Sequence, residues 1–113
     1  MEAFEIADLV AAQRGPEHVY AEFLRSDLLS VGLASWPAGS VDTQQPHTED
    51  EVYYVVQGRG LISVAGEGRA VGPGSIVFVA TGVEHRFHDV EEDLHVLVFW
   101  APPRRSRQPA AGT

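Results

Sequence analysis

The sequence contains no cysteine and no lysine. Without cysteine, the chain has no disulfide, no thiolate ligand and no thiol nucleophile. Because all eight basic residues are arginine, it also lacks a lysine for Schiff-base chemistry or for a Walker-type phosphate loop. No apolar run approaches the length of a membrane span, and the N-terminus has no basic segment followed by an apolar one. We therefore expect a cytoplasmic protein that does not bind a membrane.

Positive charge is also scarce over most of the chain. The net charge of the whole sequence is −8, but three of the eight arginines fall after residue 101. Residues 1–101 thus carry five arginines against all sixteen acidic residues, a net charge of −11. Such a body repels phosphate backbones, so we expect no nucleic-acid partner. The end of the chain, rich in Pro, Ala and Gly, predicts a flexible C-terminal tail over residues 102–113.

A chain of 113 residues suffices for one core, and we expect a single domain over residues 1–101. Apolar positions within residues 3–13 predict a short helix, ended by Gly15 and Pro16. The remainder consists of short apolar runs separated by glycine-rich turns, which is typical of an all-β barrel or jelly roll. Turns are expected at residues 58–60 and 90–93. The expected strands cover residues 18–24, 28–36, 52–56, 61–65, 69–71, 76–79, 85–88 and 94–100.

Two stretches of this pattern carry residues that bind metals. The first, residues 39–58, places His47 and Glu51 at the start of an apolar strand, and the second, residues 74–89, places His85 in a similar setting. Imidazole and carboxylate groups at short spacing are typical divalent-metal ligands. We predict that the two stretches meet and that the three side chains converge in one pocket. The alternative is that His47 and Glu51 are exposed residues of an acidic loop.

The spacing of the first stretch resembles a motif of the cupin superfamily. That motif is Gly, five residues, His-x-His, three or four residues, Glu, six residues, Gly. In this sequence His47, Glu51 and Gly58 match its second half, whereas Gln45 replaces the first histidine. An amide oxygen is a harder and weaker ligand than imidazole, so Gln45 would favour Mn or Fe over Zn.

The second stretch is similar to the other cupin motif, which is Gly, five residues, Pro-x-Gly, two residues, His, three residues, Asn. Gly74, Gly82 and His85 match it, while Ala80 replaces the proline and Asp89 replaces the closing asparagine. Two motifs on a matching strand pattern are more specific than either alone. The resemblance covers residues 28–101.

The resemblance implies a cupin-type double-stranded β-helix, or jelly-roll barrel, with the short helix added at its N-terminus. It implies a homodimer that binds a small-molecule ligand; the apolar strands over residues 19–24 and 94–100 are candidate dimer contacts. It also implies a metal site, and the metal-binding positions that it carries over are Gln45, His47, Glu51 and His85.

Two imidazoles and one carboxylate form a ligand set that leaves coordination positions open for a substrate. We expect a divalent metal ion (Fe, Mn, Ni or Zn) and a metal-dependent cupin, with a dioxygenase or an isomerase as candidate activities. The alternative is a non-catalytic ligand-binding or structural cupin without bound metal. Apart from the ligands, Tyr53 and His95 are the candidates for a catalytic role.

Strand alternation predicts which side chains reach the pocket. One of Tyr53 and Tyr54 must point inward, and His85, Phe87 and Asp89 are expected to share the inner face. From the last strand we expect His95, Leu97 and Phe99 to line the pocket, together with Trp36. Glu49 and Asp50 are expected on the exposed outer face.

Overall fold

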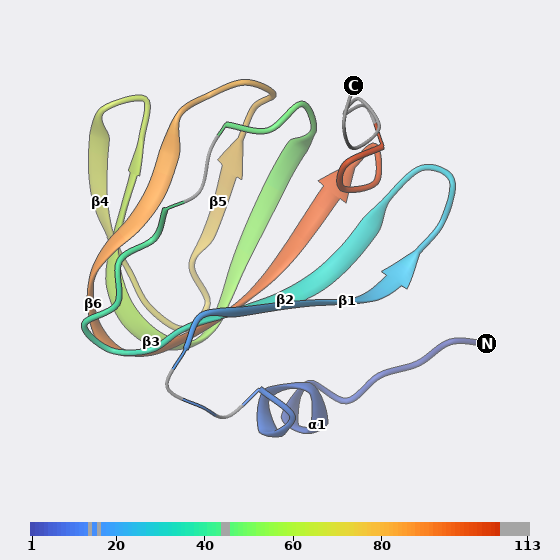
Figure 1. The fold of residues 1–113 in the computed structure, drawn as a ribbon, viewed down its shortest axis with the longest axis horizontal. Helices are drawn as coiled ribbons and strands as arrows, with labels where there is room; N and C mark the ends of the chain where they lie inside the picture. Colours follow the sequence, from blue (N-terminus) through green and yellow to red (C-terminus); the bar gives the residue numbers. More distant parts are fainter. Residues whose placement is uncertain (14, 16, 44–45, 107–113) are drawn as a thin grey trace.

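The computed structural model describes residues 1–13, 15, 17–43 and 46–106. Over these residues the chain forms one short helix and six strands in a single antiparallel sheet, which confirms the all-β fold with an N-terminal helix. The sheet order is β1-β2-β6-β3-β4, and β5 also pairs with β3. Figure 1 shows the sheet curling over itself into a barrel. The elements are α1 (Ile6–Ala11), β1 (Val19–Arg25), β2 (Ser30–Trp36), β3 (Asp50–Val64), β4 (Glu67–Val71), β5 (Ile76–Val79) and β6 (His85–Ala101).

The two longest strands, β3 and β6, pair with each other along most of their length. The turns expected at residues 58–60 and 90–93 are therefore wrong, because both strands continue through these positions. The pairing register shifts three times between Val55 and Leu61, and Figure 1 shows both strands bending there. Such bulges let a strand bend without breaking. Gly58 lies at this bend with a φ of +94°, close to the backbone of β6. The glycine therefore lets the two strands approach each other closely, and it does not reverse the chain.

Each shift of register changes which residues of a strand face the core. Before the shift in β3, Tyr53 and Val55 are buried; after it, the buried hydrophobic residue is Ile62, an even-numbered position. β6 changes in the same way after Asp89, whose φ is +48°. Because side chains alternate along a strand, one extra residue transfers all later side chains to the opposite face.

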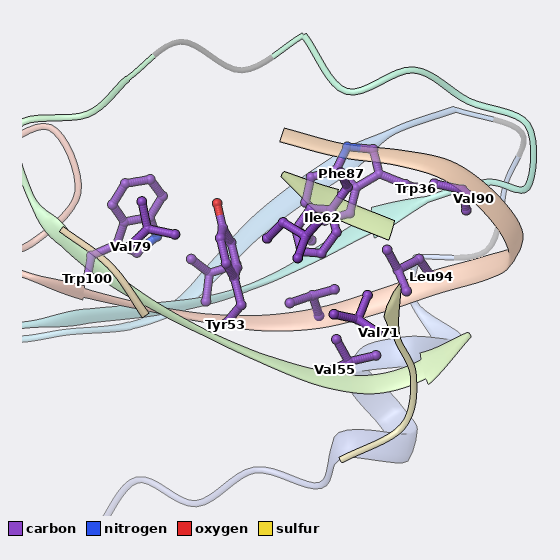
Figure 2. Packing of buried hydrophobic residues seen from close by; sticks show 13 residues of the cluster. Trp36, Tyr53, Val55, Ile62, Val71, Val79, Phe87, Val90, Leu94 and Trp100 are labelled. Carbon is purple, nitrogen blue, oxygen red and sulfur yellow. The ribbon is translucent and has the colours of Figure 1, made fainter. Parts of the chain in front are cut away.

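The expected inner face of the last strand is consequently wrong. His95, Leu97 and Phe99 point to the outer side of the barrel. The residues of β6 that fill the interior beyond Asp89 are all even-numbered: Val90, Leu94, Val96, Val98 and Trp100. The prediction that Asp89 shares the inner face is wrong as well, since its side chain is exposed and its Oδ2 lies 2.7 Å from His88 Nδ1. Asp and Asn are the side chains that best tolerate the left-handed conformation found here. Figure 2 shows the interior packing. Its cluster consists of Ala34, Trp36, Tyr53, Val55, Ile62, Val71, Val79, Phe87, Val90, Leu94, Val96, Val98 and Trp100.

Several large apolar side chains remain exposed on the outside of the barrel. Phe99 of β6 and Phe78 of β5 flank Val52 of β3, with which both are paired in register. Their exposed fractions are 38% and 59%. Apolar groups gathered over three neighbouring strands are typical of a surface that another molecule covers. The homodimer, with residues 19–24 and 94–100 as its expected contacts, stays a prediction; of these three side chains, Phe99 falls within the expected contacts.

Candidate metal centre

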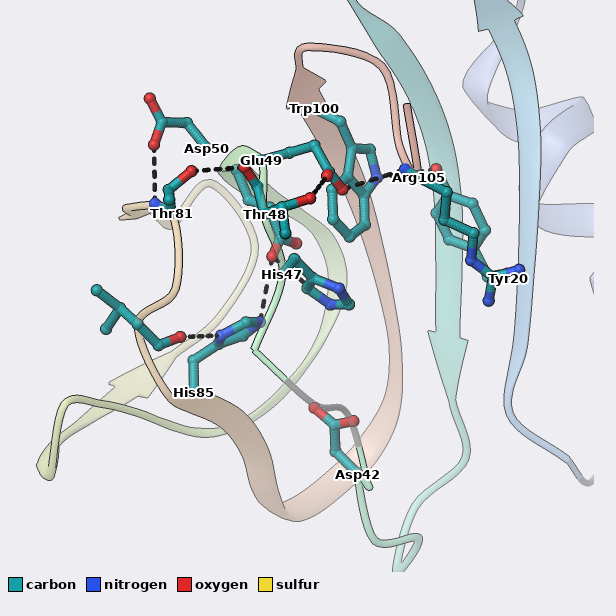
Figure 3. A network of polar contacts seen from close by, with 12 residues as sticks. Tyr20, Asp42, His47, Thr48, Glu49, Asp50, Thr81, His85, Trp100 and Arg105 are labelled. Atoms are coloured by element: carbon teal, nitrogen blue, oxygen red, sulfur yellow. Dashed lines mark hydrogen bonds and ion pairs between the residues drawn. The ribbon is translucent and has the colours of Figure 1, made fainter. Parts of the chain in front are cut away.

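His47, Glu51 and His85 meet at one end of the barrel. His47 lies in the loop before β3, Glu51 is the second residue of β3, and His85 is the first residue of β6. His85 Nε2 lies 3.2 Å and His47 Nε2 lies 3.8 Å from Glu51 Oε1. One ligand atom from each of the three residues falls within 4.8 Å of the others. Figure 3 shows the two imidazoles approaching each other, His47 from the loop before β3 and His85 from the start of β6. The structure therefore places together the three residues that the sequence predicted to converge.

Hydrogen bonds between the two loops hold this arrangement. Gly82 N donates to the His47 carbonyl at 2.7 Å, and Thr81 Oγ1 donates to the Thr48 carbonyl at 2.8 Å. The Thr81 N–H also donates to Asp50 Oδ1 at 2.8 Å (Figure 3). Gly82 has a φ of +74°, a conformation open to glycine. The loop after β5 is thus fastened to the loop before β3, which brings the two motifs together.

A second contact orients His85 within the site. Its Nδ1 lies 2.8 Å from the carbonyl oxygen of Val83, which accepts hydrogen bonds but cannot donate them. Nδ1 therefore carries a proton, and Nε2 faces Glu51. A histidine held through one ring nitrogen by a carbonyl presents the other nitrogen as a metal ligand.

The buried polar atoms of the cluster provide a test of whether a metal fits. Both Glu51 oxygens and His85 Nε2 are buried and have no hydrogen-bond partner among the described residues. The 3.2 Å contact between His85 and Glu51 has an ion-pair distance without hydrogen-bond geometry. Burying a carboxylate without partners is costly, about 1–3 kcal/mol or more for each unsatisfied group. A cation coordinated by these atoms removes that cost, so the residues present fit a divalent metal.

The environment moves the pKa values of the two histidines in opposite directions. For His47, burial lowers the pKa, and the attraction of Glu51 offsets this only in part. For His85, burial also acts to lower the pKa, but the contacts with Glu51 and the Val83 carbonyl outweigh it and raise the pKa. Metal binding requires both imidazoles to be in the neutral form, so a metal is expected to compete with the second proton of each ring, most directly at His85.

We predict that in the metal-free protein His85 keeps its proton above pH 6.5, whereas His47 loses its proton below pH 6.5. The protonated His85 then stabilises the fold below pH 6.5, and this contribution is lost as the pH rises through its folded pKa. His47 has the opposite effect: because its folded pKa is lowered, the fold loses stability as the pH falls below 6.5. Nitrogen–proton NMR titration, assigned with His47→Gln and His85→Gln, measures both values. The reverse order of the two pKa values would contradict this account.

Comparison with known proteins agrees with this geometry. A family model described as a Cupin domain matches residues 32–101, more than half of the chain. The chain belongs to the cupin family. An uncharacterized protein of Streptomyces coelicolor, SCO3923, is 47% identical over 103 residues, covering 91% of this chain and 98% of the relative.

Solved structures share the fold of this cupin. KdgF from Halomonas sp. is 25% identical with a TM-score of 0.73, over 80% of this chain and 83% of its own. TT1209 from Thermus thermophilus is 24% identical with a TM-score of 0.77, over 91% of this chain and 99% of its own. The DMSP lyase DddQ from Ruegeria pomeroyi is 24% identical with a TM-score of 0.72, over 83% of this chain and 50% of its own. Because the last two structures are less than 25% identical to this chain, the similarity to them shows a common fold and no more.

A cavity of about 300 Å³ opens beside the His47–Glu51–His85 cluster of this cupin and is lined in part by His47. Tyr53 lines it and is the inward-pointing member of the tyrosine pair, and Trp36 lines it as expected. His95 does not, because it lies on the opposite face of β6 with its Nδ1 2.7 Å from Ser35 Oγ. Gln45, the expected fourth ligand, lies outside the described residues. The cavity is lined by His18, Tyr20, Ala34, Trp36, Pro46, His47, Tyr53, Val98, Trp100, Arg104 and Arg105.

The structure also reveals residues that sequence reasoning missed. Glu49, expected to be exposed, is buried; its carboxylate accepts hydrogen bonds from the Thr48 hydroxyl and the backbone N–H of Arg105 (Figure 3). Asp42 is buried too, and its Oδ2 accepts from the backbone N–H of Phe87 at 2.9 Å. Both side chains satisfy backbone groups of distant segments, which no local pattern reveals.

The first part of the expected flexible tail is held in place. Arg104 N donates to Ser30 Oγ at 2.9 Å, and Arg105 N donates to Glu49 Oε1 at 3.1 Å. The tail expectation needs correction at these two residues, whose backbone is anchored and whose side chains line the cavity; residues 107–113 lie outside the described part. Within the residues that the structure describes, no helix has both the length and the apolar character needed to cross a membrane.

Proposed function

We propose that this cupin binds one divalent transition metal through His47, Glu51 and His85 and uses it to act on a small molecule in the adjoining cavity. The observation that carries the proposal is the set of buried Glu51 and His85 ligand atoms without hydrogen-bond partners, next to His47. Two imidazoles and one carboxylate suit Fe, Mn, Ni or Zn and leave positions open for a substrate. Gln45 stays a proposed fourth ligand.

A metal held here would polarise an oxygen of the bound molecule or activate dioxygen, so an isomerase or a dioxygenase is the proposed activity. The residues around it bind and orient the substrate. Tyr53 projects into the cavity from β3, two residues beyond Glu51 on the same face of the strand, where its hydroxyl can donate a hydrogen bond or a proton. Trp36 and Trp100 supply apolar walls that exclude water from one side of the cavity.

Ligand binding without turnover is the second candidate, favoured by the scarcity of acid–base groups around the cavity. Burial raises the pKa of Tyr20 to about 12, so this residue stays protonated at neutral pH. His18 uses its Nδ1 for a 2.8 Å hydrogen bond with the Ser35 carbonyl and stacks on Trp36. Both side chains are thus engaged in structural contacts.

We predict that the protein purified without added metal contains close to one equivalent of Fe, Mn, Ni or Zn, measured by plasma mass spectrometry. Gln45→Ala would retain the metal if three ligands suffice. A protein that is empty and takes up no metal on incubation would overturn the proposal. Adding nitric oxide to an anaerobic Fe(II)-loaded sample then separates the two roles, since a spectroscopic change requires an open coordination position.

A further inference from the structure

Two arginines of the segment after β6 line the cavity beside His47. Arg104 and Arg105 share this cavity with His47 and Tyr53. They are unusual in a chain whose residues 1–101 carry a net charge of −11. Charge of this sign inside a cavity of an acidic protein attracts anions and repels cations.

The backbone that carries these arginines is anchored by groups from three other segments. Arg104 donates its N–H to Ser30 and accepts a 3.2 Å hydrogen bond from Arg25 Nη1 at its carbonyl. The N–H of Arg105 is bound by the buried carboxylate of Glu49. The side chains of Arg104 and Arg105 are therefore presented to the cavity from a fixed backbone. Among the described residues, Glu49 forms no ion pair with either guanidinium, because its carboxylate is directed at that backbone.

The guanidinium of Arg104 rests on aromatic rings. Its Cζ lies 4.6 Å from the ring centre of Tyr20 and 5.6 Å from that of Trp100. Tyr20 is itself fixed, because its hydroxyl accepts a 3.0 Å hydrogen bond from Trp100 Nε1. Stacking holds the plane of the guanidinium and leaves its N–H edge available. In the part of the chain that the structure describes, neither Arg104 nor Arg105 makes a guanidinium ion pair or hydrogen bond.

The charges of Arg104 and Arg105 are close enough to influence each other and the group formed by His47, Glu51 and His85. Burial lowers the pKa of Arg104, and the neighbouring positive charge of Arg105 lowers it further, while Tyr20, Glu22 and Glu51 oppose both effects. Arg104 in turn acts to lower the pKa of His47. The partly buried Arg104 and the exposed Arg105 beside it repel each other, and an anion bound between them relieves that repulsion.

We propose that the small molecule bound in this cavity is an organic acid, held by its carboxylate at Arg104 and Arg105 with the rest of the molecule directed toward His47, Glu51 and His85. The orientation of the acid toward these three residues rests on the proposed function, whereas the binding of its carboxylate by the arginines does not. The planar fork of arginine matches a carboxylate with two parallel hydrogen bonds. A cavity of about 300 Å³ is at the lower end of the ligand-site range, so the acid is small.

The test compares carboxylates with amides of the same shape: benzoate with benzamide, propionate with propionamide, and lactate with lactamide. Calorimetry is done on the chelator-stripped and on the metal-reloaded full-length protein. We expect at least one carboxylate to bind more tightly than its amide, in both forms. Arg104→Gln is expected to weaken that carboxylate about ten- to hundredfold, leaving the amide unchanged, because a hydrogen bond to a charged group is lost. Arg104→Lys, which keeps the charge but loses the fork, should fall between.

Arg59→Gln is the matched control. It removes the same charge from the bulge in β3, where Arg59 is 63% exposed and faces Glu92. The control should bind the carboxylate like the parent protein, and circular dichroism checks that all variants are folded. Equal binding of acids and amides, or a carboxylate preference that survives in Arg104→Gln, would overturn the proposal. If the proposed metal site is wrong but the carboxylate proposal is right, the protein takes up no metal, and the stripped protein still prefers the carboxylate.

Discussion

Replacing Glu51 with Gln is expected to empty the metal site. The substitution keeps the size of the side chain but removes the charge that lies within 4 Å of both imidazoles. Loss of groups that only orient metal ligands weakens metal binding about 10–100-fold, so loss of a ligand should exceed a hundredfold. Metal content by plasma mass spectrometry and zinc titration by calorimetry measure the effect. In the stripped variant, the pKa of His85 should also fall, because Glu51 is a main cause of its increase.

Glu49→Gln is the control for this experiment. Glu49 is a second carboxylate, equally buried and two residues away, but it binds the Thr48 hydroxyl and the Arg105 backbone. Its variant is expected to retain the metal and to lose about 1 kcal/mol of stability, the usual worth of a charge-assisted hydrogen bond that becomes neutral. If Glu51→Gln binds metal like Glu49→Gln, the assignment of the ligands is wrong.

Replacing Gly58 with Ala is expected to have the largest effect on folding. A Cβ at this position would lie 2.2 Å from the carbonyl oxygen of Asp93 and 2.7 Å from Leu94 Cα, both backbone atoms of β6. Backbone cannot move aside as a flexible side chain can, and the φ of +94° adds strain. We expect a loss of about 3–5 kcal/mol, a large part of the stability of a small domain, measured by urea denaturation.

Gly74→Ala separates the clash from the backbone strain. Gly74 has a similar φ, +91°, but a Cβ there meets no atom within 4 Å. Its substitution is expected to cost about 1–2 kcal/mol through conformation alone. Equal losses in the two variants would mean that the crossing of β3 and β6 is looser than the structure indicates.

The correct sequence predictions were those that depend on short-range spacing. Strand-forming residues and glycine-rich turns gave an all-β fold, and the spacings around His47, Glu51 and His85 predicted that these side chains would converge. Spacing suffices for these features because each ligand lies at or within a few residues of a strand end, and strand ends at one mouth of a barrel meet. One of Tyr53 and Tyr54 was predicted to point inward, and it is Tyr53, because no bulge separates it from Glu51 in β3.

The tertiary structure decided what lies beyond the bulges and in the loops. Glycines at 58 and 60 suggested a turn, but a glycine that admits a neighbouring strand has the same local appearance as one that reverses the chain. The resulting change of face brought Trp100 inward and His95 outward, with Asp89 at the irregular position. A bulge depends on the partner strand, so the residues of one strand do not predict it.

The sequence by itself thus determined the family, the strand-rich fold and the three candidate metal ligands, because motif spacing and alternation are local properties. Only the tertiary structure decided which face of β6 lines the interior, and that Arg104 and Arg105 line the cavity. The segment carrying them is fixed by Ser30 and Glu49, which are 74 and 56 residues away in the chain. Contacts of such long range arise from the closed shape of the barrel, and they determine the charge that a ligand meets.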